Sequence, residues 1–228
     1  MRHRPAAVAF DVIETLFSLE PLKPKFKEAG LAAESLQVWY ARTLRDGMAL
    51  DLTGQFRPFR DVAQSALQGL LAEHGLQTAE DQIDTILNGL SELPAHSDVQ
   101  PSLELLRSAG ISAIALTNGS AQNTRKLFQR AGFEHLVARI TSIDQVQRWK
   151  PARPVYLQAV LDAGVEPDQL ALVAAHAWDI QGAHGAGLTT AWFPRTEKRF
   201  SEVMEKPDVK SGTLLEAVQG LLDLPMAG

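Results

Sequence analysis

The sequence predicts an α/β protein with a doubly wound parallel sheet, a Rossmann-like core, and an inserted all-helical cap domain. Three observations predict it: short apolar runs that suit buried strands, helical segments between them, and one long interval with helical patterns only. A chain of 228 residues is long enough for such a core and an insertion. The apolar runs are residues 6–12, 111–116, 138–143, 170–175 and 189–193.

The segments between these runs carry helix start and stop signals. Three of them end directly before a glycine, namely 101–109, 121–131 and 154–163. Single helices that join successive strands indicate right-handed βαβ units, with helices on both faces of the sheet.

The interval after the first strand contains no strand-like run. Its apolar residues recur at helical spacing in 34–50, 61–71 and 81–90. We therefore divide the chain into a core domain, residues 1–16 and 94–228, and a helical cap domain, residues 17–93. We expect residues 224–228 to fray.

Composition excludes several classes of protein. The 22 Lys+Arg against 27 Asp+Glu give a net charge of -5, which argues against nucleic-acid binding. The absence of cysteine excludes disulfides, thiolate zinc sites and thiol nucleophiles. No apolar run approaches the roughly 20 residues that span a bilayer, and the N-terminus does not have the pattern of a secretory signal. We expect a cytoplasmic protein without nucleic-acid or membrane partners.

Polar residues follow the predicted strands at the edge where parallel sheets bind ligands. They are Asp11 and Thr15 after the first, Thr117 and Asn118 after the second, Lys150 after the third, and His176 and Asp179 after the fourth. Any one of them alone could have an ordinary structural role. Together they could form a covalent ester on a carboxylate and then activate water, or hold a divalent cation in a phosphatase.

These motifs resemble those of the haloacid dehalogenase superfamily. They read FDVIETL at 10–16, ALTNGS at 115–120, KP at 150–151 and AAHAWD at 174–179. KPARPVY at 150–156 and AWDIQGAHGAGLTTAWFPR at 177–195 make the sequence most similar to type II (L-2-haloacid) dehalogenases. The resemblance implies that a carboxylate displaces halide from a small anionic substrate and that water then cleaves the ester, without metal or cofactor. It also implies a homodimer.

The resemblance assigns roles to individual residues. Asp11 would be the nucleophile, with Lys150 and Asp179 as its electrostatic partners. The implied pocket residues are Thr15, Thr117, Asn118, Tyr156 and Trp178.

Two departures concern the residues after the nucleophile. Superfamily phosphatases usually have a proton-donating Asp where this chain has Ile13, and general acid catalysis is typically worth ~10²–10⁴-fold. Halide leaves without a proton, so Ile13 weakens the phosphatase hypothesis and is compatible with dehalogenation. Dehalogenases usually have Tyr-Gly where this chain has Ile13-Glu14.

Further departures affect substrate binding. The Arg that grips the substrate follows a Trp in dehalogenases, but here Trp39 is followed by Tyr40. Arg42 and Arg45 are near, although Arg42 points about 200° away from Tyr40 on a helix, so only a local shift of alignment would bring one of them into the pocket. The apolar face with Tyr40 would pack on the core or on a second copy of the chain.

The usual Ser and Asn before the Trp-Asp pair are here Ala174 and His176. His176 could activate water, bind a substrate carboxylate when protonated, or only fill space. Three hypotheses follow: a metal-independent hydrolase that acts on small 2-haloacids or related electrophiles, a magnesium-dependent phosphatase, and a binding protein that has lost catalysis.

Overall fold

The computed structural model describes residues 2–77 and 79–226, and its centre is a six-stranded parallel sheet of order β3-β2-β1-β4-β5-β6. The strands are β1 Ala7–Phe10, β2 Ser112–Thr117, β3 Arg139–Ser142, β4 Leu170–Ala174, β5 Thr189–Trp192 and β6 Val209–Lys210. β1 lies between β2 and β4, and its side chains are buried on both faces, as its unbroken apolar sequence predicts. The predicted fold class is confirmed.

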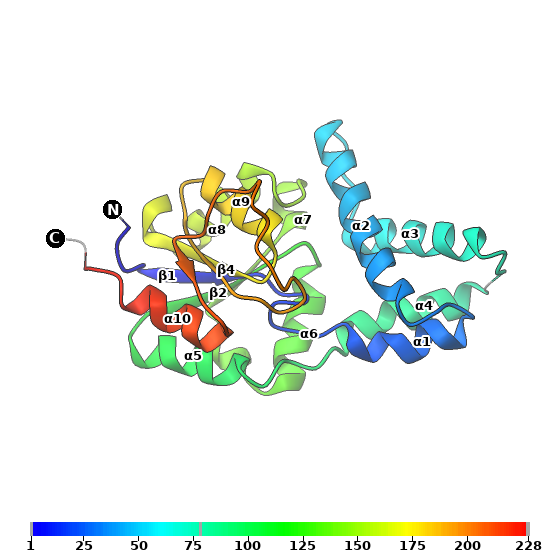
Figure 1. Cartoon of the computed structure of the whole chain (residues 1–228), viewed down its shortest axis with the longest axis horizontal. Coiled ribbons are helices and arrows are strands. Elements are labelled where there is room, and N and C mark those ends of the chain that lie inside the picture. Colours follow the sequence, from blue (N-terminus) through cyan, green and yellow to red (C-terminus); the bar gives the residue numbers. More distant parts are fainter. Residues whose placement is uncertain (1, 78, 227–228) are drawn as a thin grey trace.

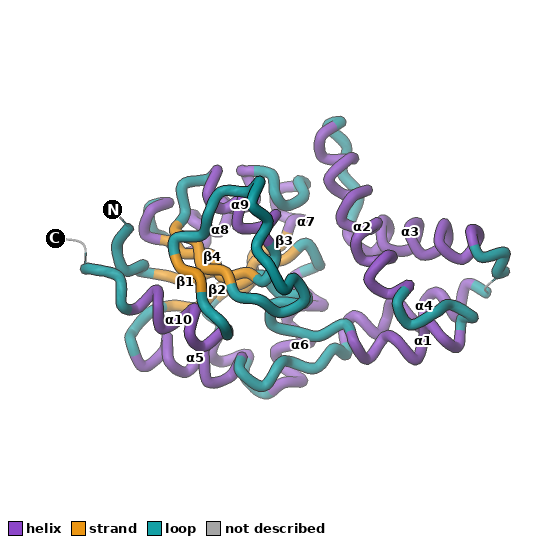
Figure 2. The backbone as a smooth tube through the Cα atoms, in the orientation of Figure 1, coloured by secondary structure: helices purple, strands orange, loops and turns teal. Residues whose placement is uncertain are grey.

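Helices cover both faces of the sheet (Figures 1 and 2). α5, α6 and α10 lie on one face, and α8 and α9 lie on the other. Their bounds are α5 Val99–Ser108, α6 Ala121–Ala131, α8 Arg153–Ala163, α9 Ala177–Gly185 and α10 Leu214–Leu222, and the short α7 spans Ile143–Val146. Single-turn 3₁₀ helices occupy Glu20–Leu22, Gly89–Ser91, Glu134–Leu136 and Pro167–Gln169.

The interval between β1 and α5 is helical and lies apart from the sheet, beyond the carboxyl ends of the strands (Figure 1). Its α-helices are α1 Lys23–Glu28, α2 Ser35–Leu52, α3 Phe59–Glu73 and α4 Glu80–Asn88. Trp39 joins two of them, because its buried indole donates a hydrogen bond of 2.8 Å to the Ala63 carbonyl of α3. We propose that residues 17–93, called the helical insertion below, form a cap domain on a core of residues 1–16 and 94–228.

The chain enters and leaves the helical insertion through two adjacent segments. Phe17 and Ala95 form an antiparallel bridge, and the Ser18 amide donates to the Pro94 carbonyl at 3.0 Å. The His96 amide donates to the Leu16 carbonyl at 2.9 Å. These bonds hold both segments next to the loop that follows β1.

Five predicted strands and six predicted helices are confirmed, with ends shifted by a few residues. α5 begins at Val99, because Pro101 can occupy the first turn, where its missing N–H costs no hydrogen bond. Sequence patterns missed the short elements α1, α7 and β6, as well as α9 and α10. The expected fraying falls partly on residues 227–228, outside the described residues. Among the residues described, no helix is long and apolar enough to cross a membrane.

Candidate active site

The carboxyl end of β1 places Asp11 at the ligand-binding edge of the sheet. Its amide donates to the Val173 carbonyl of β4 at 3.1 Å, so the backbone of the residue is fixed by the neighbouring strand. The Thr15 hydroxyl donates to Asp11 Oδ2 at 2.6 Å and accepts the Ala175 amide at 3.1 Å. Because Thr15 must accept from the backbone, its proton is directed at the carboxylate.

Lys150 is fully buried and connects two carboxylates. Its Nζ lies 3.0 Å from Asp11 Oδ1 and 2.8 Å from Asp179 Oδ2. Burial by itself lowers the pKa of this ammonium, but the two carboxylates outweigh burial and raise it. Lys150 therefore stays charged at neutral pH and balances part of the charge of the two acids.

The two carboxylates differ in acidity. Burial by itself raises the pKa of Asp11, but Lys150, His176 and Thr15 together hold it well below its ordinary value. The pKa of Asp179 is raised, because burial and the charge of Asp11 outweigh Lys150. Asp11 is thus ionised near neutral pH, as a carboxylate nucleophile must be.

Asp179 lies in the first turn of α9, where Tyr156 of α8 donates to its Oδ1 at 2.6 Å. This contact requires a glycine at position 182, because a Cβ there would overlap with Tyr156 Oη and Pro151 Cβ. Close packing of α8 on α9 thus explains the glycine at position 182.

Thr117 ends β2, Asn118 follows it, and both are buried at the same edge of the sheet. Asn118 Oδ1 accepts the Lys150 amide at 3.1 Å, and Thr117 Oγ1 accepts the Gly119 amide at 2.9 Å. The Asn118 amide N–H groups and the Thr117 hydroxyl proton remain able to donate to a ligand.

His176 ends the turn after β4 and meets the helical insertion. Its ring lies 6.4 Å from that of Tyr40 and 5.7 Å from that of Trp178. Its Nδ1 is 3.4 Å from Asp11 Oδ2, but the atom is buried and makes no hydrogen bond among the described residues. Burial lowers the pKa of His176, whereas Asp11 and Glu197 raise it, and the net pKa is above its ordinary value.

The helical insertion brings Tyr40, but neither nearby arginine, to this site. Arg42 points away and pairs with Glu73 of α3 at 2.7 Å, as the helical angle predicts, and Arg45 pairs with Asp46 at 2.8 Å. Burial and the neighbouring carboxylates raise the pKa of Tyr40 well above its ordinary value, so its phenol keeps its proton. Tyr40 can therefore donate a hydrogen bond.

Sequence reasoning missed the segment of residues 195–197, whose side chains bind the loop after β1 and the start of α9. Arg195 donates to the Thr15 carbonyl at 3.0 Å and to Asp98 at 2.9 Å. Thr196 donates to Glu14 at 2.8 Å, and Glu197 accepts the Ala177 amide at 3.0 Å, at the start of α9. No local sequence pattern signals these contacts, since their partners lie up to 182 residues away.

Glu14 departs from the expected glycine but adopts a glycine-like backbone, with φ of 64°. Its buried carboxylate accepts the Leu19 amide at 2.7 Å as well as the Thr196 hydroxyl. The side chain thereby joins the nucleophile loop to the first segment that enters the helical insertion.

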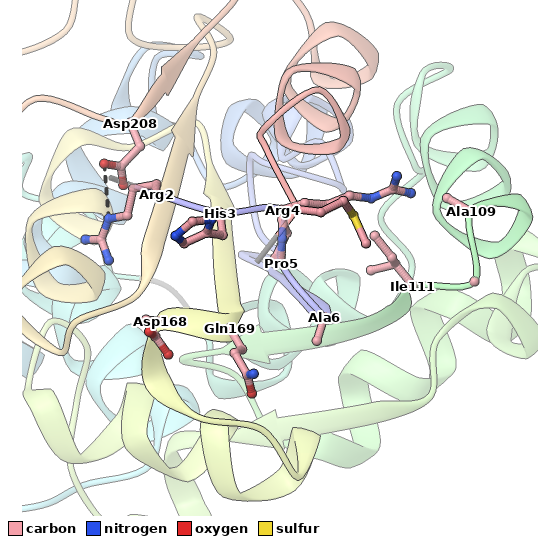
Figure 3. Close-up of a pocket in the computed structure, with 12 residues that line it drawn as sticks. Arg2, His3, Arg4, Pro5, Ala6, Ala109, Ile111, Asp168, Gln169 and Asp208 are labelled. Atoms are coloured by element: carbon pink, nitrogen blue, oxygen red, sulfur yellow. Dashed lines mark hydrogen bonds and ion pairs between the residues drawn. The ribbon is translucent and has the colours of Figure 1, made fainter. Parts of the chain in front are cut away.

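Two cavities lie at opposite ends of the sheet. One, of about 1080 Å³, is lined by N-terminal residues and by residues directly before β2 and β4, at the opposite end of the strands from Asp11. Figure 3 shows its lining side chains. The other, of about 650 Å³, is lined by α2, His176 and Trp178. Lining residues of the candidate site occur in the second cavity and also in a smaller one of about 80 Å³, which lies beside Ile13, Phe59 and Thr117.

The donor set around Asp11 does not resemble a metal centre. Within residues 2–77 and 79–226, no group of three or more His, Asp or Glu side chains could hold a metal ion. Lys150 Nζ binds both Asp11 and Asp179, the two carboxylates that a cation would need.

Comparison with known proteins identifies the family of the chain. The family model described as haloacid dehalogenase-like hydrolase matches residues 5–187. The (S)-2-haloacid dehalogenase of Pseudomonas sp. strain YL is 28% identical over 214 residues, which cover 93% of this chain and 92% of that protein. The (S)-2-haloacid dehalogenase 2 of Pseudomonas sp. strain CBS-3 is 28% identical over 222 residues, 96% of this chain and 93% of that protein.

Solved structures share the fold over nearly the whole chain. The L-2-haloacid dehalogenase RSc1362 has a TM-score of 0.90 and 26% identity, and covers 97% of this chain and 99% of its own. The L-2-haloacid dehalogenase of Xanthobacter autotrophicus with chloropropionic acid covalently bound has a TM-score of 0.87 at 22% identity, with 94% and 97% covered.

Proposed function

Since the chain belongs to the haloacid dehalogenase-like hydrolase family, we propose that it hydrolyses the carbon–halogen bond of small 2-haloacids through an ester on Asp11. The observation that carries this proposal is an ionised, buried Asp11 held by Lys150, with an apolar Ile13 where a proton donor would stand. The similarity to two (S)-2-haloacid dehalogenases over more than nine-tenths of the chain supports the same reaction.

In the first step, a carboxylate oxygen of Asp11 attacks C2 of the substrate. A C–O bond forms, the carbon–halogen bond breaks, and the halide leaves with the bonding electron pair. Lys150 and Thr15 orient the carboxylate for this attack, which is the near-attack positioning that accelerates a displacement. The Asn118 amide and Thr117 hydroxyl provide donors for the leaving halide or the substrate carboxylate.

In the second step, water attacks the carboxyl carbon of Asp11 and the ester C–O bond breaks. The departing alkoxide takes up the second proton of that water, so a 2-hydroxy acid leaves and the Asp11 carboxylate is restored. His176 accepts the proton of this water, since its Nδ1 faces the Asp11 carboxyl group at 3.4 Å. Ester formation removes the negative charge of Asp11, which had raised the pKa of His176. His176 therefore releases its proton to solvent once the ester has formed, and is a free base at the stage where water must be activated.

Ile13 disfavours the phosphatase alternative. An alkoxide leaving group requires a proton, and no side chain at position 13 can supply it. The described part of the chain also has no cluster of three or more His, Asp or Glu side chains that could hold the magnesium ion of a phosphatase.

Halide release from (S)-2-chloropropanoate tests the proposal directly. We expect release by the wild-type protein in the presence of chelator and none by Asp11→Asn. Asp168→Asn, the same change at an exposed carboxylate, serves as the matched control and should retain full activity. Single turnover in H₂¹⁸O should place the label in the Asp11 side chain. Undiminished halide release by Asp11→Asn, or phosphate-ester hydrolysis that requires magnesium, would overturn the proposal.

A further inference from the structure

An apolar groove runs along α2 and ends at Tyr40 and His176, next to the candidate nucleophile Asp11. One wall is a face of α2, and the other is the start of α9 with residues 196–197. Its volume is about 650 Å³. The α2 wall consists of Gln37, Tyr40, Ala41, Leu44, Arg45, Met48, Ala49 and Leu52.

The α2 wall is a continuous hydrophobic stripe. Tyr40, Leu44, Met48 and Leu52 recur every fourth residue, so they lie one above another on the same face of the helix. At 1.5 Å per residue, the stripe is about 18 Å long. Leu52 at its outer end is 87% exposed, so the apolar surface continues into solvent.

The inner end of the groove is polar and belongs to the active site. His176 and Tyr40 line this end, and His176 Nδ1 lies 3.4 Å from Asp11 Oδ2. Trp178 lies beside His176 in the opposite wall. The groove thus has a polar head region at the reacting group and an apolar body that leads away from it.

The charged groups of the groove do not favour a second charge on the ligand. Arg45 is exposed and paired with Asp46 at 2.8 Å, and Glu197 accepts the Ala177 amide. A ligand that matches the groove has one polar, reactive end and one hydrocarbon body.

We propose that this groove binds the hydrocarbon chain of the substrate, so that the protein prefers 2-haloacids with an extended alkyl chain over the shortest members of the class. This inference rests on the proposed dehalogenation. Each methylene buried against Leu44, Met48 or Trp178 adds binding energy remote from the reacting carbon, and such energy helps to hold the reacting carbon at Asp11.

The test compares kcat/KM for halide release from (S)-2-bromopropanoate, (S)-2-bromohexanoate and (S)-2-bromooctanoate. We expect each methylene to raise kcat/KM about two- to fourfold, so that the hexanoate exceeds the propanoate about tenfold or more. Ala49→Trp fills the middle of the groove, and we expect it to bring the hexanoate-to-propanoate ratio close to one.

Val38→Trp is the matched control. Val38 is an exposed residue of the same helix that does not line the groove, so this variant should keep the wild-type ratio. Circular dichroism spectra and melting temperatures verify that both variants are folded.

The outcomes separate the two proposals. Turnover of the propanoate with no preference for longer acids would overturn the groove assignment and leave the dehalogenase proposal intact. No halide from any of the acids would overturn the proposed function itself. An unchanged substrate ratio in Ala49→Trp, with a changed molecular mass by light scattering, would show that a second copy of the chain covers the groove and would overturn the assignment.

Discussion

The two sides of the candidate site are built on different principles. On the sheet side, all four carboxylate oxygens of Asp11 and Asp179 accept hydrogen bonds from Lys150, Thr15 or Tyr156. On the side of the helical insertion, His176 Nδ1 is buried without a hydrogen bond among the described residues. A satisfied network is rigid and fixes the chemistry, whereas an unsatisfied polar atom is available to a substrate or water. The comparison therefore distinguishes a rigid network that holds the nucleophile from the side that faces the insertion, where substrate or water can bind.

The largest effect should come from breaking the sheet side at Lys150. Lys150→Met leaves two buried carboxylates facing each other, and the loss of one partner from a buried ion pair costs about 3–5 kcal/mol. We expect urea unfolding of Lys150→Met to show a free energy of unfolding lowered by that amount, and we expect no measurable halide release from this variant. Lys126→Met, at an exposed position of α6, is the control. A Lys150→Met protein as stable as the control would contradict the rigid-network interpretation.

A smaller effect, confined to the rate of turnover, should follow from changing His176, on the side of the site that faces the helical insertion. His176→Asn removes the base and should lower kcat about 10²-fold, at the lower end for general base catalysis. A burst of halide followed by slow turnover in stopped-flow experiments would show that the ester accumulates. His184→Asn, within α9 and away from the site, should leave kcat unchanged. An increase in KM with normal kcat would instead assign His176 to carboxylate binding.

The rigidity of the sheet side can also be tested without removing a charge, by changing the packing between α8 and α9. Gly182→Ala forces a methyl group against Tyr156 and Pro151, and such overpacking typically costs about 1–3 kcal/mol. We expect a lower melting temperature and weaker activity, because Tyr156 moves from Asp179. Gly185→Ala meets open space on the same helix and should be neutral or stabilising. Equal melting temperatures for the two variants would refute this role of Gly182.

The smallest effect is a pH dependence of stability. The folded-state pKa of His176 is raised, so its contribution to stability is fully present below the unfolded pKa and is lost as pH rises through the folded pKa. The difference in unfolding free energy between wild type and His176→Asn should therefore shrink from pH 5 to pH 8. Glu197→Gln should reduce the difference at pH 5. A difference that grows with pH would contradict the ion pair with Asp11.

The sequence could predict the sheet side because its residues follow buried strands. Runs of apolar residues located Asp11 and Asp179, and parallel strands bring their carboxyl ends to one edge. The resemblance to a known family placed Tyr156 as well. These predictions rest on local patterns and on one rule of topology.

The side of the site that faces the helical insertion depends on contacts that no local sequence pattern predicts. Helical geometry predicts that Arg42 points away from Tyr40, but it does not show that Tyr40 faces His176. Gly182 lowers the helix propensity of α9, and the close approach of Tyr156 that requires this glycine is visible only in the folded protein. The contacts of Arg195 and Glu197 join segments far apart in the chain and become visible only in the folded protein.

The ion-pair network also sets a charge balance. Two carboxylates and one ammonium leave one formal negative charge at the place where an anionic acid would have to arrive. A protonated His176 cancels that charge, whereas a neutral His176 leaves the entering anion repelled. Proposed substrate capture and ester hydrolysis therefore require opposite protonation states of one imidazole. Such a site works best in a window of pH bounded on the alkaline side by binding and on the acidic side by turnover.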